Sequence, residues 1–187
     1  MSSKESTTDH GIETVEIFAD GLARDYAILN QNNNSAAARL VWFVAIAGFA
    51  LLNVGSLANS IIGTPLAQLH FVLLVFPWAL AGLCGIVAHW LNGEVMARDN
   101  VYHILKQHAI RAWLANAPRQ PSVQEVLSII NVDTTDDEVA KRKSAVDKIS
   151  PAARWWENAT FASLIFSFSW SVLFPLGIFI FNSCVNS

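Results

Sequence analysis

Histidine is the residue type in this chain best suited to ligate a haem, and His70 and His89 lie in one apolar stretch. A histidine at membrane depth can serve as an axial haem ligand. These two lie near opposite ends of one predicted helix, too far apart to hold the same haem, and the other apolar stretches contain no histidine. Haem binding would need a ligand from another subunit, so we expect no cofactor and keep a haem-binding redox subunit as the third functional alternative.

His103 and His108 are the histidines that a helix could bring closest together. They are five residues apart, which places them on different faces, whereas zinc ligands on a helix are spaced by one turn. The cysteines, Cys84 and Cys184, form no cluster with them in the sequence. We therefore expect no metal site.

Acidic residues, which acid–base catalysis would need, all lie in residues 1–39 and 94–157. The apolar stretches contain no Asp, Glu, Lys or Arg, and a proton relay through a membrane needs such groups at depth. The sequence also lacks the G-x-S-x-G, H-E-x-x-H and phosphate-loop motifs. We expect a protein that is not an enzyme and has no catalytic residues.

Small polar residues recur at helical spacing inside the apolar stretches and form the candidate polar path. Ser and Thr hydroxyls can bond the carbonyl one turn back in their own helix, so such stripes are common where helices pack together. The alternative is a narrow polar path that forms when several copies assemble with the stripes turned inward. The candidates are Asn53, Ser56, Ser60, Thr160, Ser163, Ser167 and Ser171.

The distribution of charge predicts the architecture that positions these residues. No Asp, Glu, Lys or Arg occurs from Leu40 to Gly93 or from Asn158 to Ser187, although the chain has 12 basic and 15 acidic residues. A bilayer core of about 30 Å needs about 20 apolar residues per helix. We therefore predict an all-α integral membrane protein with three transmembrane helices, at 40–61, 67–91 and 160–181, the first two joined by a Gly- and Pro-containing turn.

The positions of the basic residues predict the topology. Every Lys and Arg lies in residues 1–39 or 92–159, which should therefore be cytoplasmic by the positive-inside rule. The predicted domains are a cytoplasmic N-terminal amphipathic helix with an Asn-rich turn, a transmembrane hairpin, a cytoplasmic helical insert, and a third transmembrane helix with a short tail outside. Their bounds are 1–39, 40–91, 92–159 and 160–187.

The N-terminal helix carries a repeating apolar seam. Its members alternate at spacings of three and four residues, which is the a/d pattern of helices that pack along each other. The seam could pack on the chain's own cytoplasmic helices or mediate self-association between subunits. It consists of Ile12, Val15, Ala19, Leu22, Tyr26 and Leu29.

Small residues in the first two predicted spans form a candidate helix-packing face. They allow helix backbones to approach closely, which drives association where lipid provides no hydrophobic force. The contact could lie within the hairpin or between subunits. The face consists of Ala45, Gly48, Gly55, Ala81 and Gly85.

The insert contains two capping boxes, in which a Ser or Thr is followed three residues later by a Glu. Ser122–Glu125 should open one short helix, and Thr135–Glu138 should open another. Between Gly93 and these boxes, the second span should continue as a helix with an apolar face. That face consists of Val95, Tyr102, Leu105, Ala109 and Ala112.

Together these features predict a non-enzymatic, self-associating membrane protein. Its most specific form is an oligomeric pore or membrane-permeabilising effector gated by its cytoplasmic helices. Its layout resembles that of bacterial defence effectors that permeabilise the inner membrane, and we expect it in a bacterial inner membrane. The alternative is an accessory or assembly subunit of a larger membrane complex. The expected partners are the bilayer and other copies or other membrane subunits, and a net charge of −3 does not suggest nucleic acid.

Overall fold

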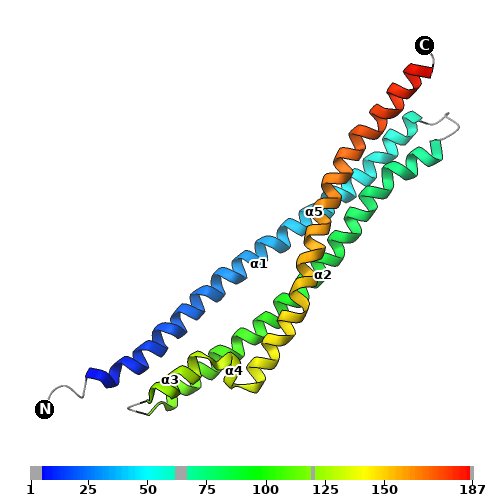
Figure 1. Ribbon diagram of the computed structural model, residues 1–187. Coiled ribbons are helices and arrows are strands. Elements are labelled where there is room, and N and C mark those ends of the chain that lie inside the picture. The colour runs from blue at the N-terminus through cyan, green and yellow to red at the C-terminus, as the bar shows by residue number, and fades with distance from the viewer. Residues whose placement is uncertain (1–5, 62–66, 119–120, 186–187) are drawn as a thin grey trace. The chain divides into compact units, whose positions relative to one another are not determined.

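The computed structural model describes residues 6–61, 67–118 and 121–185, and its secondary-structure elements are all helices (Figure 1). Three of them are long and apolar enough to cross a membrane, namely α1, α2 and α5. The all-α prediction with three long apolar helices is therefore confirmed. The helices are α1 (Ser6–Ile61), α2 (Ala67–Asn116), α3 (Val123–Ile130), α4 (Val132–Thr135) and α5 (Asp137–Val185).

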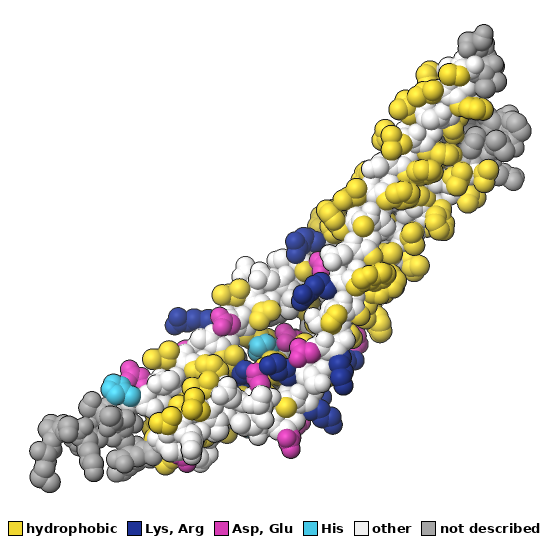
Figure 2. Space-filling model, in the orientation of Figure 1, with side chains coloured by type: hydrophobic (Ala, Val, Ile, Leu, Met, Phe, Trp, Pro, Cys, Tyr) yellow, Lys and Arg dark blue, Asp and Glu magenta, His cyan; other side chains and the backbone are white. Residues whose placement is uncertain are grey.

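The chain divides into two compact units, to each of which α1, α2 and α5 contribute. Unit 1 comprises Met1–Ser35 and Gly93–Ser150, and unit 2 comprises Ala36–Asn92 and Pro151–Ser187. Unit 1 carries most of the charged side chains, whereas hydrophobic side chains cover the visible surface of unit 2 (Figure 2).

One local prediction about α1 is wrong. Residues 30–35, expected to form an Asn-rich turn, are helical, and the Ser35 hydroxyl donates to the Gln31 carbonyl at 2.9 Å. Asn has only a modest helix penalty of about 0.7 kcal/mol or less, so the long flanking helical segments override it. The predicted turn between the first two spans falls on residues 62–66, which lie outside the described residues.

Unit 2 consists of parts of α1, α2 and α5, and its core combines small and large apolar side chains. Ala47 of α1 is fully buried between Leu74, Trp78 and Ala81 of α2, and Leu164 of α5 completes the cluster. Large apolar side chains cover the outside, for example Phe49 at 71% exposure and Leu52 at 81%. Such a surface is costly in water and suits a hydrocarbon environment.

The helices of unit 2 approach one another closely at Gly85. A Cβ atom there would lie 2.8 Å from Val44 Cγ2 and 3.4 Å from Thr160 Cγ2, so only glycine allows this approach. On α1 the contact comes from Val44 and Ala47, whereas Ala45 of the predicted packing face is exposed. The small residues of α2 do lie in the contact, since Ala81 is 1% exposed.

Pro77 interrupts the hydrogen bonding of α2 inside unit 2. Proline has no backbone N–H, so the carbonyl of Leu73, four residues earlier, loses its helical donor. The Trp170 indole Nε1 of α5 donates to that carbonyl at 3.0 Å. One residue on, the Trp78 indole donates to the Ser171 hydroxyl at 2.9 Å, so two tryptophans join α2 to α5.

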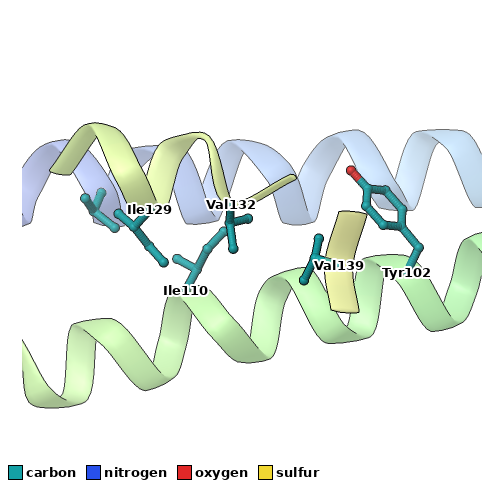
Figure 3. Packing of buried hydrophobic residues seen from close by; sticks show 6 residues of the cluster. Tyr102, Ile110, Ile129, Val132 and Val139 are labelled. Carbon is teal, nitrogen blue, oxygen red and sulfur yellow. The ribbon is translucent and has the colours of Figure 1, made fainter. Parts of the chain in front are cut away.

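Unit 1 has its own hydrophobic core, to which all five helices contribute (Figure 3). Ile129 and Val132 project from α3 and α4 toward Ile110 of α2 (Figure 3). Burial of these apolar side chains is the main favourable contribution to folding of such a small bundle. The buried residues are Val15, Tyr102, Ile110, Ile129, Val132 and Val139.

Local capping explains where α3 and α5 begin. The Ser122 hydroxyl accepts from the Glu125 backbone N–H at 3.2 Å, and the Ser122 N–H donates to the Glu125 carboxylate at 2.7 Å, so the first predicted capping box is confirmed. The second is wrong, because the Asp136 carboxylate accepts from the N–H groups of Glu138 and Val139. The Thr135 hydroxyl instead donates to the Ser128 carbonyl.

Candidate functional site

A partly buried cluster of polar side chains in unit 1 is the strongest candidate for a functional site. We call Tyr102, Lys106, Asp133 and Lys143 the Asp133 cluster. Lys106 is only 7% exposed, and its ammonium lies 2.9 Å from Asp133 Oδ1. Lysine is rarely buried unless it is paired. The desolvation penalty of the buried ammonium must therefore be offset by its interaction with Asp133.

Three side chains converge on the Asp133 carboxylate. Besides Lys106, the Tyr102 hydroxyl donates to Oδ1 at 2.8 Å, and the Lys143 ammonium lies 3.3 Å from Oδ2. Burial raises the pKa of Asp133, but the hydrogen bonds from Lys106 and Tyr102 outweigh it, so the pKa lies below its ordinary value. The carboxylate is therefore charged at neutral pH and ties α2, α4 and α5 together.

A second group of side chains joins α1 to α2 beside this cluster. His103 is 8% exposed, and its ring lies 4.6 Å from the Tyr26 ring of α1, between ring centroids. The Tyr26 hydroxyl donates to the Asn100 side-chain oxygen, and His103 Nε2 lies 3.5 Å from Asp99 Oδ1. The Nδ1 atom of His103 is buried without a hydrogen-bond partner among the described residues.

The chemistry open to this site is ionic and structural. In the described part of the chain, no group of three or more His, Cys, Asp or Glu side chains could hold a metal ion. The Lys106–Asp133 pair instead joins α2 to α4, and the neighbouring Val132 is buried at 3% exposure in the core of unit 1. This arrangement sets the conformation of unit 1.

Comparison with known proteins adds no functional assignment. Neither protein-family models, nor curated proteins, nor solved structures contain a match to this chain. Function must therefore be argued from the geometry of the chain itself.

The predicted N-terminal seam packs largely within its own chain. Val15 is fully buried, Ala19 and Leu22 pack against the core of unit 1, and Tyr26 contacts α2. Ile12 is half-buried. Leu29, at the end of the seam, is 43% exposed. The alternative that this seam packs on the chain's own helices is the one that agrees with these contacts.

The four hydroxyl side chains of the candidate polar path on α5 face partly into the interior of unit 2. Thr160 and Ser167 are fully buried, and each of the four hydroxyls donates to the carbonyl four residues earlier in α5. This is the bonding expected of residues that pack helices together. The four are Thr160, Ser163, Ser167 and Ser171.

The other sequence candidates lie apart from this stripe or outside the described side chains. The Asn53 amide donates to the Phe49 carbonyl at 2.8 Å, and its side chain is exposed. The side chains of Ser56, Ser60, Gly55 and His70 lie outside the described set, while His89 is exposed. Gly48 has no atom within 4 Å of the position of an added Cβ.

Sequence reasoning missed a second seam, on the outward face of α2 in unit 1. Its six residues alternate at spacings of four and three, as the a and d positions of a heptad repeat do. Every one of them is exposed, with Val101 at 42% and Ile104 at 62%. The spacing alone could have revealed this seam. We call Ala97, Val101, Ile104, His108, Arg111 and Ala115 the outer seam.

Proposed function

We propose that this chain is a non-enzymatic membrane protein that self-associates through unit 1, with unit 2 as its membrane anchor. The observation that carries the proposal is the exposed outer seam of α2. The basic residues of unit 1 support a cytoplasmic location for it and for the N-terminus, with the C-terminal tail outside. A bacterial inner membrane is the proposed location.

The outer seam has the composition of a helix–helix contact at its centre. Val101 and Ile104 place branched apolar side chains in a unit that otherwise carries most of the charge. Each apolar Å² removed from water contributes about 25 cal/mol, so covering the seam stabilises an assembly. A heptad spacing presents these side chains in one line to a second helix.

The occupant of the seam is a second copy of this chain. Copies inserted in one membrane share their orientation, so two α2 helices would meet in parallel and each seam residue would face its own equivalent. Of the flanking side chains, Arg98 is charged, whereas Asn100, Leu105, Gln107 and Ala112 are uncharged and do not repel across such a contact. Arg111 would meet Arg111 of the partner, which limits the contact to the part from Ala97 to His108.

An accessory subunit of a larger complex is the alternative that one observation favours. His108 and Arg111 lie in the outer seam, where they suit an acidic partner helix better than a second copy. The pore version of self-association receives less support, because Thr160 and Ser167 are buried inside a single subunit. A polar path lined by Thr160 and Ser167 would require α5 to rotate about its axis, so that these side chains leave the interior of the subunit.

Oxidative crosslinking of an introduced cysteine, with the buried Cys84 retained, tests self-association directly. In a Cys184→Ser background, Ile104→Cys should form a disulfide-linked dimer in native membranes, while Ser144→Cys, exposed on α5, should not. Ile104→Asp should reduce the mass of the detergent-purified particle to that of one chain. Monomers at every concentration, with no crosslink at position 104, would exclude this function, and co-purification of another membrane subunit would favour the alternative.

A further inference from the structure

His103 of α2 contacts two aromatic rings where α1 meets α2 in unit 1. The centroid of its ring lies 4.6 Å from that of Tyr26 in α1 and 4.9 Å from that of Tyr102. We propose that His103 is a proton sensor whose protonation releases the segment of α1 around Tyr26 from α2. All three residues belong to unit 1, and the release needs no second copy of the chain.

The surroundings of His103 suit the neutral imidazole better than the imidazolium. The side chain is 8% exposed, and its Nδ1 atom has no hydrogen-bond partner among the described residues. With its proton on Nε2, which lies 3.5 Å from Asp99 Oδ1, the neutral ring leaves Nδ1 as an unused acceptor. Protonation would add a buried charge and a second N–H that has no acceptor in this site, and both are costly away from water.

Charged neighbours act on His103 in both directions. Burial of the ring is the largest influence and lowers the pKa of His103. Asp99 and Asp133 raise this pKa and Lys106 lowers it, and the result lies below the ordinary value of about 6.5. On the other elements, Arg24 and Asp25 beside Tyr26 are exposed, while the α5 groups Lys143 and Asp147 act on the neighbours Asp133 and Tyr102.

Acidification should therefore weaken the contact of α1 with α2. Because the folded pKa is lowered, the stability that His103 contributes is fully present above about pH 6.5 and is lost as the pH falls through the folded pKa. Opening of the contact lets water reach the ring, so the open form takes up a proton near the ordinary histidine pKa. The open fraction should rise by up to about tenfold between about pH 7.5 and about pH 5.5.

α1 is held lightly at this position, so that a local release is possible. Tyr26 is the one residue among positions 23–29 that is not exposed. Its hydroxyl donates to the side-chain oxygen of Asn100, and water can replace that hydrogen bond when the contact opens. Toward the N-terminus, Val15 is fully buried in the core of unit 1, so the rest of α1 in this unit can stay in place.

Hydrogen exchange of the full chain in a nonionic detergent, followed by mass spectrometry at about pH 7.5 and about pH 5.5, tests the proposal. The protection factors of the amides in residues 23–29, which correct for intrinsic exchange, should fall by up to about tenfold at the lower pH. Those around the buried Ile110 should not change. His103→Phe retains an aromatic ring without a titratable nitrogen and should abolish the fall, whereas His108→Phe, at an exposed position of the same helix, should retain it.

Three results would overturn the assignment. They are a fall of less than about twofold in the original chain, a fall that persists in His103→Phe, and an equal fall throughout unit 1, which would indicate general unfolding. His103→Gln, with helicity followed by circular dichroism, replaces His103→Phe if that variant does not fold.

Asp99→Asn tests the sensor without replacing the histidine. Asp99 favours the imidazolium, so its loss should move the midpoint of the fall in protection to lower pH. A purely structural role of the ring predicts no such shift. A midpoint that is unchanged or raised in Asp99→Asn would contradict titration of His103 as the cause.

Discussion

The Trp170 indole donates to the Leu73 carbonyl at 3.0 Å, although these residues are 97 positions apart in the chain. This carbonyl is the one that Pro77 deprives of its helical donor. In apolar surroundings a carbonyl without a donor is costly. A side chain of α5 therefore completes the backbone hydrogen bonding of α2, and a proline becomes tolerable within a long apolar helix.

Trp170→Phe should lower the stability of unit 2 by about 1 kcal/mol, within the range measured for hydrogen bonds between membrane helices. Pro77→Ala restores the missing N–H, so the same Trp170 substitution should cost less in a Pro77→Ala background. Unfolding in mixed detergent micelles, followed by circular dichroism, measures all four forms. Trp155→Phe, at an exposed site, is the matched control. Equal costs of Trp170→Phe in both backgrounds would contradict the proposed coupling.

How far the sequence predicts this structure depends on the range of the interaction. Ion-free stretches and the Ser122 capping box are local signals, and both predicted their elements correctly. The side of a helix that faces a neighbour is a tertiary property, so spacing alone selected Ala45 on α1 where the contact uses Ala47. The Asp133 cluster has no local signal at all, because Lys106 and Asp133 are 27 residues apart and lie on different helices.

Gly85→Ala should destabilise unit 2, because its new methyl group would lie 2.8 Å from Val44 Cγ2. Relieving the overlap requires the Val44 side chain or α1 to shift, and overpacking of this kind costs about 1–3 kcal/mol. Gly48→Ala is the control, since nothing lies within 4 Å of that position. There, alanine should leave stability unchanged or raise it by up to about 1 kcal/mol through helix propensity. The same unfolding assay compares them, and equal effects at both sites would contradict the close approach of α1 and α2.

Lys106→Met should destabilise unit 1 by about 3 kcal/mol, near the lower end for breaking a buried ion pair. The loss leaves the Asp133 carboxylate with Tyr102 and the more distant Lys143 as partners. Hydrogen exchange of the amides in α3 and α4 should accelerate, because Asp133 anchors that segment. Glu138→Gln, which breaks an exposed pair with Arg142, should change stability by less than about 0.5 kcal/mol. Unchanged exchange in Lys106→Met would show that the pair does not hold α4.

The pH dependence of unit 1 should report Asp133. Its folded pKa lies below the ordinary value of about 3.9. The carboxylate therefore contributes stability that is fully present above the unfolded pKa and is lost as the pH falls through the folded pKa. The protection factors of the α4 amides, which correct for the pH dependence of intrinsic exchange, should fall below about pH 4. Asp133→Asn should show less of this acid dependence. Asp137→Asn, at an exposed neighbouring position, should retain the acid dependence. An equal loss of acid dependence in that control would show that Asp133 is not its cause.

Ser167 separates a packing role of the hydroxyl stripe from a role in permeation. Its hydroxyl is buried and donates to the Ser163 carbonyl in its own helix, so Ser167→Ala should cost less than about 1 kcal/mol. Ser167→Leu should cost about 1–3 kcal/mol, because the larger side chain overfills a fully buried position in unit 2. Proteoliposomes carrying the alanine variant should show the same ion leak as the original chain. A selective loss of leak in that variant, at unchanged stability, would instead place Ser167 on a conducting path, because removing a lining hydroxyl changes the path without disturbing the fold.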